Sequence, residues 1–350
     1  MKFTGAKFMR LVKLILLFYL LIVGVQLFRK AVLASESDII SHLSLNHNVL
    51  NSFGIAWLAS NLILNGSPVA AIAVGLHSSG IISSSVGISA ILGSRVGATA
   101  IAFLLGGLYY MRGKMLKRSL SSPTVILLIT LLMSAVSLIV GLLLVRSSVF
   151  MSQSYVRIGH DGIAEPLFFS LFEMLFRLLG PAYSMVASVL IIIIIAELLE
   201  KTLLLPEDKK QIMSTGVIDK IVHSQTLSFL AGLVLTAVFF TVAVSFSLLI
   251  PLHASKRITR EEMIPYIIGA NIGTFSDTAL IAFFTGNAET VLLVLACVAS
   301  NILAAMLLLT WDSFPKRIVG LSDMILATRG RTVAFLLSLV MLPVSLMMLF

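Results

Sequence analysis

The sequence predicts an all-α polytopic membrane protein that contains an inverted repeat, two re-entrant hairpins and about seven transmembrane helices. Three observations lead to this fold class. The chain of 350 residues is 58% hydrophobic and only 12% charged, with a mean hydropathy of +1.06. Its apolar runs, such as residues 189–195, lack the apolar–polar alternation of a membrane barrel. The chain also matches itself at one fixed offset.

The first predicted helix covers residues 14–28 and follows a basic segment, residues 2–13. A signal peptide cleaved after Ala34 is the alternative interpretation. Arg29 and Lys30 follow the apolar stretch directly, where a signal peptide has small residues before its cleavage site. This arrangement favours a retained signal anchor with its N-terminus in the cytoplasm.

An internal repeat is the next feature of the chain. Residues 76–79, Leu-His-Ser-Ser, match residues 252–255, Leu-His-Ala-Ser, at an offset of 176 residues (253 − 77 = 176). The same offset pairs His47 with His223, Gly93 with Gly269 and Gly97 with Gly273 without a gap. Matched His, Ser and Gly residues at one offset favour two homologous halves over chance similarity between apolar segments.

Charge indicates how the two halves are oriented. The loop at residues 78–89 has no charged residue, whereas its counterpart at residues 256–262 is basic with two acids. Basic loops stay on the cytoplasmic side, so the first loop is predicted outside and the second inside, which makes the repeat inverted. The predicted first repeat spans residues 1–145, with helix 14–28, hairpin 50–76, helix 90–111 and helix 122–145. The predicted second repeat spans residues 182–350, with helix 182–199, hairpin 226–252, helix 265–285, helix 290–310 and a C-terminal helix 332–350.

The two hairpins follow from this topology, because residues 50–76 and 226–252 must each enter and leave on the same side. Asn65-Gly66-Ser67-Pro68 interrupts the first apolar run, and Gly and Pro are the residues that break helices. The middle of the second run, residues 240–245, has no such breaker. A kinked span or two short tilted helices is the alternative for each.

Residues 146–181 join the two halves and are predicted to form an extracellular loop and an interfacial helix. In the part from Pro166 to Gly180, Glu173 and Arg177 are spaced i, i+4 among Phe and Leu residues. We expect this segment to lie along the membrane rather than cross it.

Polar residues in the apolar segment 265–285 predict a cation-binding site. These predicted cation-binding residues are Asn271, Thr274, Ser276, Asp277 and Thr278, which offer the oxygens that a hard cation such as sodium prefers. The residue that matches Asn271 in the first copy is Arg95, which can clamp an anion, pair with Asp277 or extend to the membrane surface. The glycines Gly93, Gly97, Gly269 and Gly273 allow close backbone approach, either for helix packing or for a ligand.

Gly269-Ala270-Asn271-Ile272-Gly273-Thr274 resembles the GANIGT signature of the sodium/phosphate cotransporter family, the bacterial and archaeal relatives of type II sodium-dependent phosphate transporters. Residues 251–268, which lead into it, and Ser300-Asn301-Ile302 with the later Trp311 are similar to the family's flanking segments. Residues 65–76 lie where the family has its QSSSATT hairpin. The resemblance covers roughly residues 14–320. It implies the inverted-repeat fold and phosphate and sodium as ligands.

The chain departs from the family where the ligands are expected. Leu64-Asn65-Gly66-Ser67 and Phe240-Thr241-Val242-Ala243 replace the family's Gln-Ser-Ser-Ser. The predicted substrate-binding residues that the resemblance implies are Asn65, Gly66, Ser67, Arg95, Thr241 and Ser245.

We therefore expect a multi-pass protein of the cell membrane that carries inorganic phosphate, or a similar anion, together with sodium by alternating access. Transport of another anion, coupling to protons, or a transport-dead sensor or structural homologue are the alternatives. The basic clusters have the spacing of cytoplasmic loops, so nucleic acid is not an expected partner. The single cysteine, Cys297, gives no metal or redox motif. No apolar segment carries a nucleophile and base pair or a metal cluster, so we expect no enzyme activity and no cofactor beyond the transported sodium. The sequence leaves monomer and homodimer both open.

Overall fold

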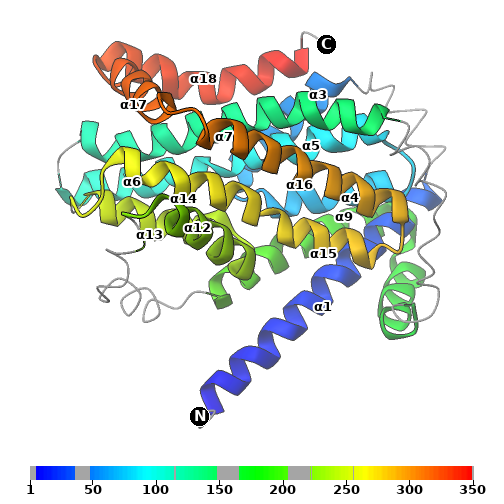
Figure 1. Ribbon diagram of the computed structural model, residues 1–350. Coiled ribbons are helices and arrows are strands. Elements are labelled where there is room, and N and C mark those ends of the chain that lie inside the picture. The colour runs from blue at the N-terminus through cyan, green and yellow to red at the C-terminus, as the bar shows by residue number, and fades with distance from the viewer. Residues whose placement is uncertain are drawn as a thin grey trace.

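The computed structural model describes residues 5–35, 48–113, 116–147, 165–203, 221, 223–254 and 256–348, and in these residues all regular structure is helical (Figure 1). The helices are α1 Gly5–Ala34, α3 Val49–Ile63, α4 Ser67–Ser78, α5 Ser84–Ala98, α6 Ala100–Gly113, α7 Leu116–Arg146, α9 Glu165–Leu203, α12 Gln225–Phe239, α13 Val242–Ala254, α14 Arg260–Gly273, α15 Phe275–Phe284, α16 Ala288–Leu309, α17 Phe314–Ile325 and α18 Arg329–Met348. The all-α prediction is confirmed for this part of the chain.

Seven helical stretches of the described residues are long and apolar enough to cross a membrane. They are Val12–Ala34, Ser84–Gly107, Leu120–Arg146, Leu171–Leu199, Arg260–Phe284, Ala288–Leu309 and Arg329–Met348. Each of the seven predicted helices overlaps one of these stretches, which confirms their number. Two of the predicted helices are each divided in two, 90–111 at Thr99 and 265–285 at Thr274. Predicted helix 182–199 is part of α9, which begins 17 residues earlier at Glu165 (182 − 165 = 17) because its apolar run extends toward the N-terminus.

The two segments that match at the 176-residue offset have the same local structure. Helices α3 and α12 both contain 15 residues, and Gln225 is the counterpart of Val49. Each is followed by one residue in the left-handed region, Leu64 at φ 59° and Phe240 at φ 57°, and then by a second short helix. The two short helices, α4 and α13, end at equivalent positions and lead to another equivalent pair with positive φ, Gly80 and Lys256.

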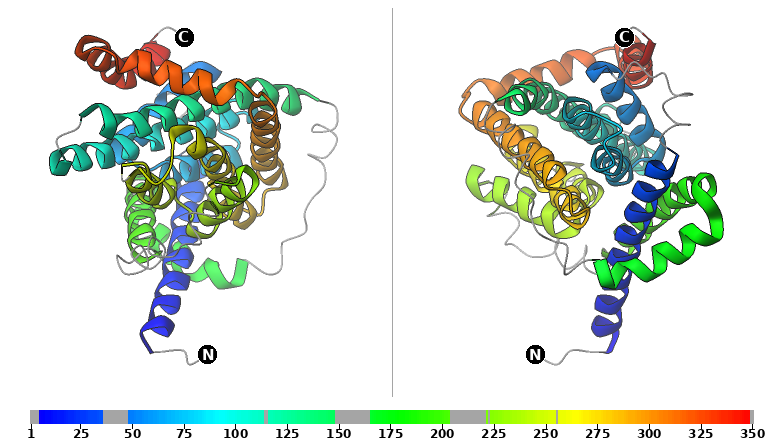
Figure 2. Two further views of the ribbon diagram at one scale, coloured as in Figure 1. Left: turned by 60° about the vertical axis from the view of Figure 1, so that its left-hand side comes forward. Right: turned by 90° about the vertical axis from the view of Figure 1, so that its right-hand side faces the viewer.

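The first helices of the two halves pack along each other. Helix α1 lies against α9, and Figure 2 shows the two side by side in its right-hand view. Helix α9 is divided at Gly180, whose φ of 71° and ψ of 174° are not helical. Glu173, on the first part of α9, lies 3.8 Å from Arg177 as the i, i+4 spacing predicts, and it also pairs with Lys30 of α1. Of the predicted loop before it, residues 148–164 lie outside the described residues.

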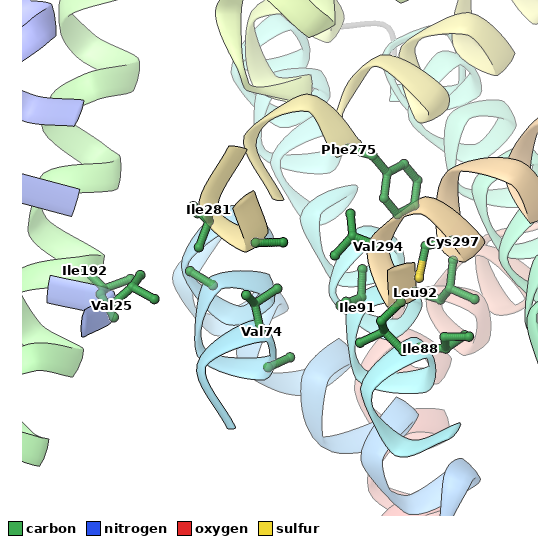
Figure 3. Close-up of a cluster of buried hydrophobic side chains, with 14 of the residues drawn as sticks. Val25, Val74, Ile88, Ile91, Leu92, Ile192, Phe275, Ile281, Val294 and Cys297 are labelled. Atoms are coloured by element: carbon green, nitrogen blue, oxygen red, sulfur yellow. The ribbon is translucent and has the colours of Figure 1, made fainter. Parts of the chain in front are cut away.

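A buried apolar cluster joins both halves in the interior. Figure 3 shows Phe275 of α15 directed toward Val294 and Cys297 of α16, while Val25 of α1 and Ile192 of α9 meet at the far side. A second cluster of buried side chains joins α7, α13, α14, α16 and α17. The broken helices are thereby held between long apolar helices, and this packing positions the site.

Different elements lie near the two ends of α16. At its start, Thr290 hydrogen-bonds His77 Nδ1 at the end of α4, and Glu289 accepts from Ser84 of α5. Past its other end, a cleft of about 310 Å³ is lined by residues that include Trp311, and by His223 and Glu262 near the starts of α12 and α14. A helix of 22 residues, as α16 is, measures about 33 Å.

Helix α17 was not predicted from the sequence. Its buried face consists of Phe314, Ile318, Val319 and Ser322, and its charged residues Lys316 and Arg317 are exposed. Arg260 of α14 forms a two-bond ion pair with Asp323 of α17, with both N–O distances 2.9 Å. Figure 1 places α17 and α18 at the face of the molecule away from the N-terminal end of α1.

Candidate functional site

The two helix breaks have the same local chemistry. In the first, the Ser67 amide donates to Asn65 Oδ1 at 3.0 Å. In the second, the Ala243 amide donates to Thr241 Oγ1 at 3.2 Å, and Thr241 is the counterpart of Asn65 at the 176-residue offset. Each polar side chain satisfies one free amide where the second helix of its pair begins, which is what keeps the break stable without Gly or Pro in the second copy.

A small cavity lies where the two breaks meet. Its polar lining comes from four of the residues predicted from the sequence, namely Asn65, Ser67, Thr241 and Asp277. The Ser67 hydroxyl donates to the Phe240 carbonyl at 3.4 Å, so the two breaks touch directly. The remaining lining is apolar and comprises Phe18, Leu21, Ala196, Leu199, Phe239, Phe240 and Ile281. The volume open to a water-sized sphere is about 20 Å³, room for about one water molecule.

Asp277 connects this cavity to a buried ion pair. Its Oδ1 lies 3.1 Å from Arg95 Nη2, and both side chains are 4% exposed. Oδ1 also accepts from the amide and the hydroxyl of Thr278, while Oδ2 has no hydrogen-bond partner among the described residues. The carboxylate therefore has one fully bonded oxygen and one oxygen free for a further ligand or proton.

Arg95 is held almost entirely by the start of α15. Its Nη1 donates to Thr274 Oγ1 at 3.0 Å, its Nη2 donates to Thr278 Oγ1, and its guanidinium carbon lies 4.9 Å from the centre of the Phe275 ring. Asp277 lies in the first turn of α15, where a negative charge is favourable to the helix dipole. Local sequence thus presents the oxygens together, and α5 brings the guanidinium to them.

The structure groups the candidate site residues differently from the prediction. Arg95, predicted among the substrate-binding residues, contacts the predicted cation-binding residues Thr274, Asp277 and Thr278. Of the alternatives for Arg95, the pairing with Asp277 is the one observed, and a side chain 4% exposed does not extend to the surface.

Three other predicted residues bond to nearby groups away from the cavity lining. Asn271 donates to the Ile267 carbonyl at 2.9 Å within α14. Ser276 donates to the carbonyls of Gly273 and Ala237, and Ser245 bonds Thr236. These side chains are satisfied within the protein, so nothing in their bonding calls for a ligand.

The four glycines predicted to allow close backbone approach, Gly93, Gly97, Gly269 and Gly273, lie where helix backbones meet. A Cβ atom on Gly93 would lie 2.3 Å from the Phe53 carbonyl oxygen, and one on Gly269 would lie 2.0 Å from that of Phe229. Gly97 and Gly273 have the same relation to Trp57 and Leu233. Gly66 is similar, because its Cβ would lie 2.7 Å from the Ser94 carbonyl oxygen. These glycines therefore serve close packing of helix backbones.

The apolar cavity residues of α1 and α9 were not predicted from the sequence. Phe18 and Leu199 carry no polar or conformational signal that separates them from other apolar residues. Phe240 had such a signal, since the offset pairs it with Leu64 beside the Asn65-Gly66 break. No family model matches the chain, and no curated protein and no solved structure matches it significantly. The family resemblance of the sequence stays a prediction.

Proposed function

We propose that this chain is a secondary active transporter that moves inorganic phosphate with sodium across the cell membrane by alternating access. The observation that carries the proposal is the meeting of two helix breaks at one cavity that Asp277 lines. Broken helices that expose backbone amides are tolerated inside a membrane where they line a binding cavity, and transporters place their substrate there.

An inverted repeat is part of the proposal, and the contacts at the helix ends support it. Val49 at the start of α3 accepts from Ser89, and His77 at the end of α4 bonds Ser84, so both ends of this pair lie near the start of α5. The start of α5 in turn contacts the start of α16, whereas the starts of α12 and α14 lie beyond the other end of α16. Two re-entrant hairpins entering from opposite sides account for this arrangement.

The cavity offers groups for an anion. Helix α4 begins at the cavity-lining residue Ser67, and α13 begins directly after the cavity-lining residue Thr241. A helix N-terminus carries partial positive charge and free amides, which bind phosphate oxygens. The Asn65, Ser67 and Thr241 side chains add polar contacts.

The same cavity offers groups for the coupling cation. Asp277 Oδ2 is buried and has no partner among the described residues, and the carbonyl and hydroxyl oxygens of the two breaks are the kind of ligand that sodium takes. A cation bound there reduces the cost of bringing an anion next to a carboxylate. Binding of the two ions is then mutually favourable, which is the requirement for symport.

The cavity in this conformation is too small for a tetrahedral oxyanion, with about 20 Å³ open to a water-sized sphere. The breaks must move apart for phosphate to enter. The Ser67 contact with Phe240 is the direct hydrogen bond between them and is expected to open.

Uptake of labelled phosphate into proteoliposomes tests the proposal, with sodium and proton gradients imposed separately. We expect a sodium gradient to accelerate uptake. Thr241→Val should reduce it about tenfold, as expected for a lost hydrogen bond to a charged group of about 1.4 kcal/mol. Thr310→Val, which changes an exposed threonine at the end of α16, is the matched control and should retain uptake. Absence of phosphate uptake under every gradient removes the proposal.

Proton coupling is the second candidate, favoured by the unpaired Oδ2 of Asp277. A carboxylate oxygen without a partner in a buried site is a place where a proton can bind and leave. Uptake driven by a proton gradient without sodium, and lost in Asp277→Asn, supports this alternative over sodium coupling.

A further inference from the structure

Three side-chain oxygen atoms, one from the residue that precedes α15 and two from its first turn, surround the Arg95 guanidinium. They are Thr274 Oγ1 at 3.0 Å, Asp277 Oδ1 at 3.1 Å and Thr278 Oγ1. All three come from five consecutive positions of the second half, whereas Arg95 comes from the first half. The oxygen cluster is therefore supplied by one short segment of the chain, and Arg95 reaches it from a different helix.

This set of oxygens is also the chemistry of a site for a monovalent metal cation. Two hydroxyl oxygens and one carboxylate oxygen are hard ligands of the type that sodium prefers. The described residues contain no group of three or more His, Cys, Asp or Glu side chains able to hold a metal ion. With Asp277 as its single acid, the cluster offers one negative charge, which matches one positive charge.

The buried Asp277 carboxylate requires a positive charge or a proton beside it, which explains why the oxygen cluster is occupied. The Asp277 side chain is 4% exposed, and an isolated carboxylate at that depth is costly unless a cation or a proton neutralises it. Arg95 supplies the cation, and the Phe275 ring at 4.9 Å covers one side of the guanidinium.

We propose that Arg95 is a tethered cation that occupies a monovalent cation site, and that removing its side chain converts the cluster into a sodium site. This inference deepens the proposed function. Since a tethered cation does not cross the membrane, the cluster contributes no transported ion in the natural chain. The coupling cation is left to the cavity at the helix breaks.

Thermal unfolding of purified protein in detergent tests the inference, with sodium chloride compared against N-methyl-D-glucamine chloride at equal ionic strength. In Arg95→Met we expect sodium to raise the unfolding midpoint by about 5 °C more than in the natural chain when its concentration is about 100 times the dissociation constant. Arg95→Lys keeps a tethered cation and should gain no such increment. Arg95→Met combined with Asp277→Asn removes both charges and should also gain none.

A matched control comes from a partly exposed ion pair, Arg260 with Asp323. Arg260→Met frees Asp323, whose side chain is 46% exposed, so water solvates the freed carboxylate and sodium should add no midpoint shift. This control separates a specific site from screening of a freed carboxylate.

Two results overturn the inference. The first is an Arg95→Met variant in which sodium shifts the unfolding midpoint by the same amount as in the natural chain. A variant that low pH stabilises but sodium does not is included in this result. The second is failure to recover folded Arg95→Met by size-exclusion chromatography from both sodium and N-methyl-D-glucamine media; recovery from sodium alone supports the site. None of these measurements requires transport. A sodium shift in Arg95→Met with no uptake by the natural chain therefore removes the transport proposal and leaves the cation site.

Discussion

Asp277 is the residue that contacts both parts of the candidate site. Its Oδ1 bonds Arg95 and Thr278, and the residue also lines the cavity between the two breaks. Any change in its charge is therefore felt by the ion pair and by a ligand in the cavity. A residue with two such roles is expected to be sensitive to substitution in both stability and uptake.

Replacement of Asp277 by alanine leaves the Arg95 guanidinium buried without its counter-charge. We expect a loss of about 3–5 kcal/mol in the free energy of unfolding, the usual cost of breaking a buried ion pair from one side. Asp323→Ala is the control, because its pair with Arg260 is partly exposed and is worth about 0–1 kcal/mol. Equal losses for the two variants, measured by unfolding in detergent, contradict a buried pair at Arg95.

His77, outside the seven candidate spans, gives a pH dependence to stability. Its Nδ1 lies 2.9 Å from Thr290 Oγ1 and its Nε2 lies 3.1 Å from Ser84 Oγ. Burial lowers the pKa of His77, and the nearby Glu289 carboxylate opposes that effect. The unfolded chain then binds a proton at a higher pH than the folded chain does. Stability is fully present above about pH 6.5, the ordinary histidine pKa, and falls as the pH drops below it.

His77→Gln is expected to remove part of this acid sensitivity. The unfolding midpoint of the natural chain should fall between pH 7.5 and pH 5.5, values on either side of about 6.5, and that of the variant should fall less. His223→Gln is the control, because the His223 side chain is 55% exposed and contacts Glu262 at the surface. A variant whose pH profile matches that of the natural chain rules out His77 as the source.

Two helix pairs set the framework at the scale of elements. Helix α5 packs on α3, and α14 packs on α12, through the equivalent glycines Gly93 and Gly269. Since these contacts are between backbones, neither neighbour can yield by changing a rotamer. The helix–break–helix units are thereby fixed close to α5, which carries Arg95, and to α14, which leads into α15 and its Asp277.

A methyl group at Gly269 is expected to separate α12 from α14. Gly269→Ala should lower the free energy of unfolding by about 1–3 kcal/mol, the usual cost of overpacking. Gly320→Ala in α17 has nothing within 4 Å of the added Cβ and should be neutral or stabilising by up to about 1 kcal/mol, since alanine favours helices. Unfolding midpoints of the two variants check this prediction. Equal shifts for Gly269→Ala and Gly320→Ala contradict close backbone packing at Gly269.

Across the whole molecule, the proposed inverted arrangement puts equivalent loops on opposite sides of the membrane. Cys297 is buried, so Cys297→Ala provides a background without cysteine. In it, Ser83→Cys and Lys256→Cys introduce one exposed cysteine each, in the loops before α5 and α14. In intact cells a membrane-impermeant thiol reagent should label the first and reach the second only after permeabilisation. Labelling of both from outside contradicts the inverted repeat.

Sequence periodicity and composition predicted the seven apolar helices and the first break, because hydropathy and Asn65-Gly66-Ser67-Pro68 are local signals. The second break at Phe240 had no Gly or Pro to announce it, yet Thr241 caps the next helix as Asn65 does. Helix α17 was missed because only one face of its 12 residues is apolar and buried.

The sequence by itself determined the membrane-spanning character, the repeated segments and the candidate polar residues, because hydropathy, a fixed offset along the chain and residue type do not depend on how the helices pack. Tertiary structure alone decided that Arg95 pairs with Asp277, 182 residues away, and that Asn65 and Thr241 line one cavity with Asp277. Pairing of a buried charge depends on which groups packing brings within about 4 Å. The sequence left three roles open for Arg95: binding an anion, pairing with Asp277 or extending to the membrane surface. The structure places Arg95 of α5 against the start of α15, where it pairs with Asp277.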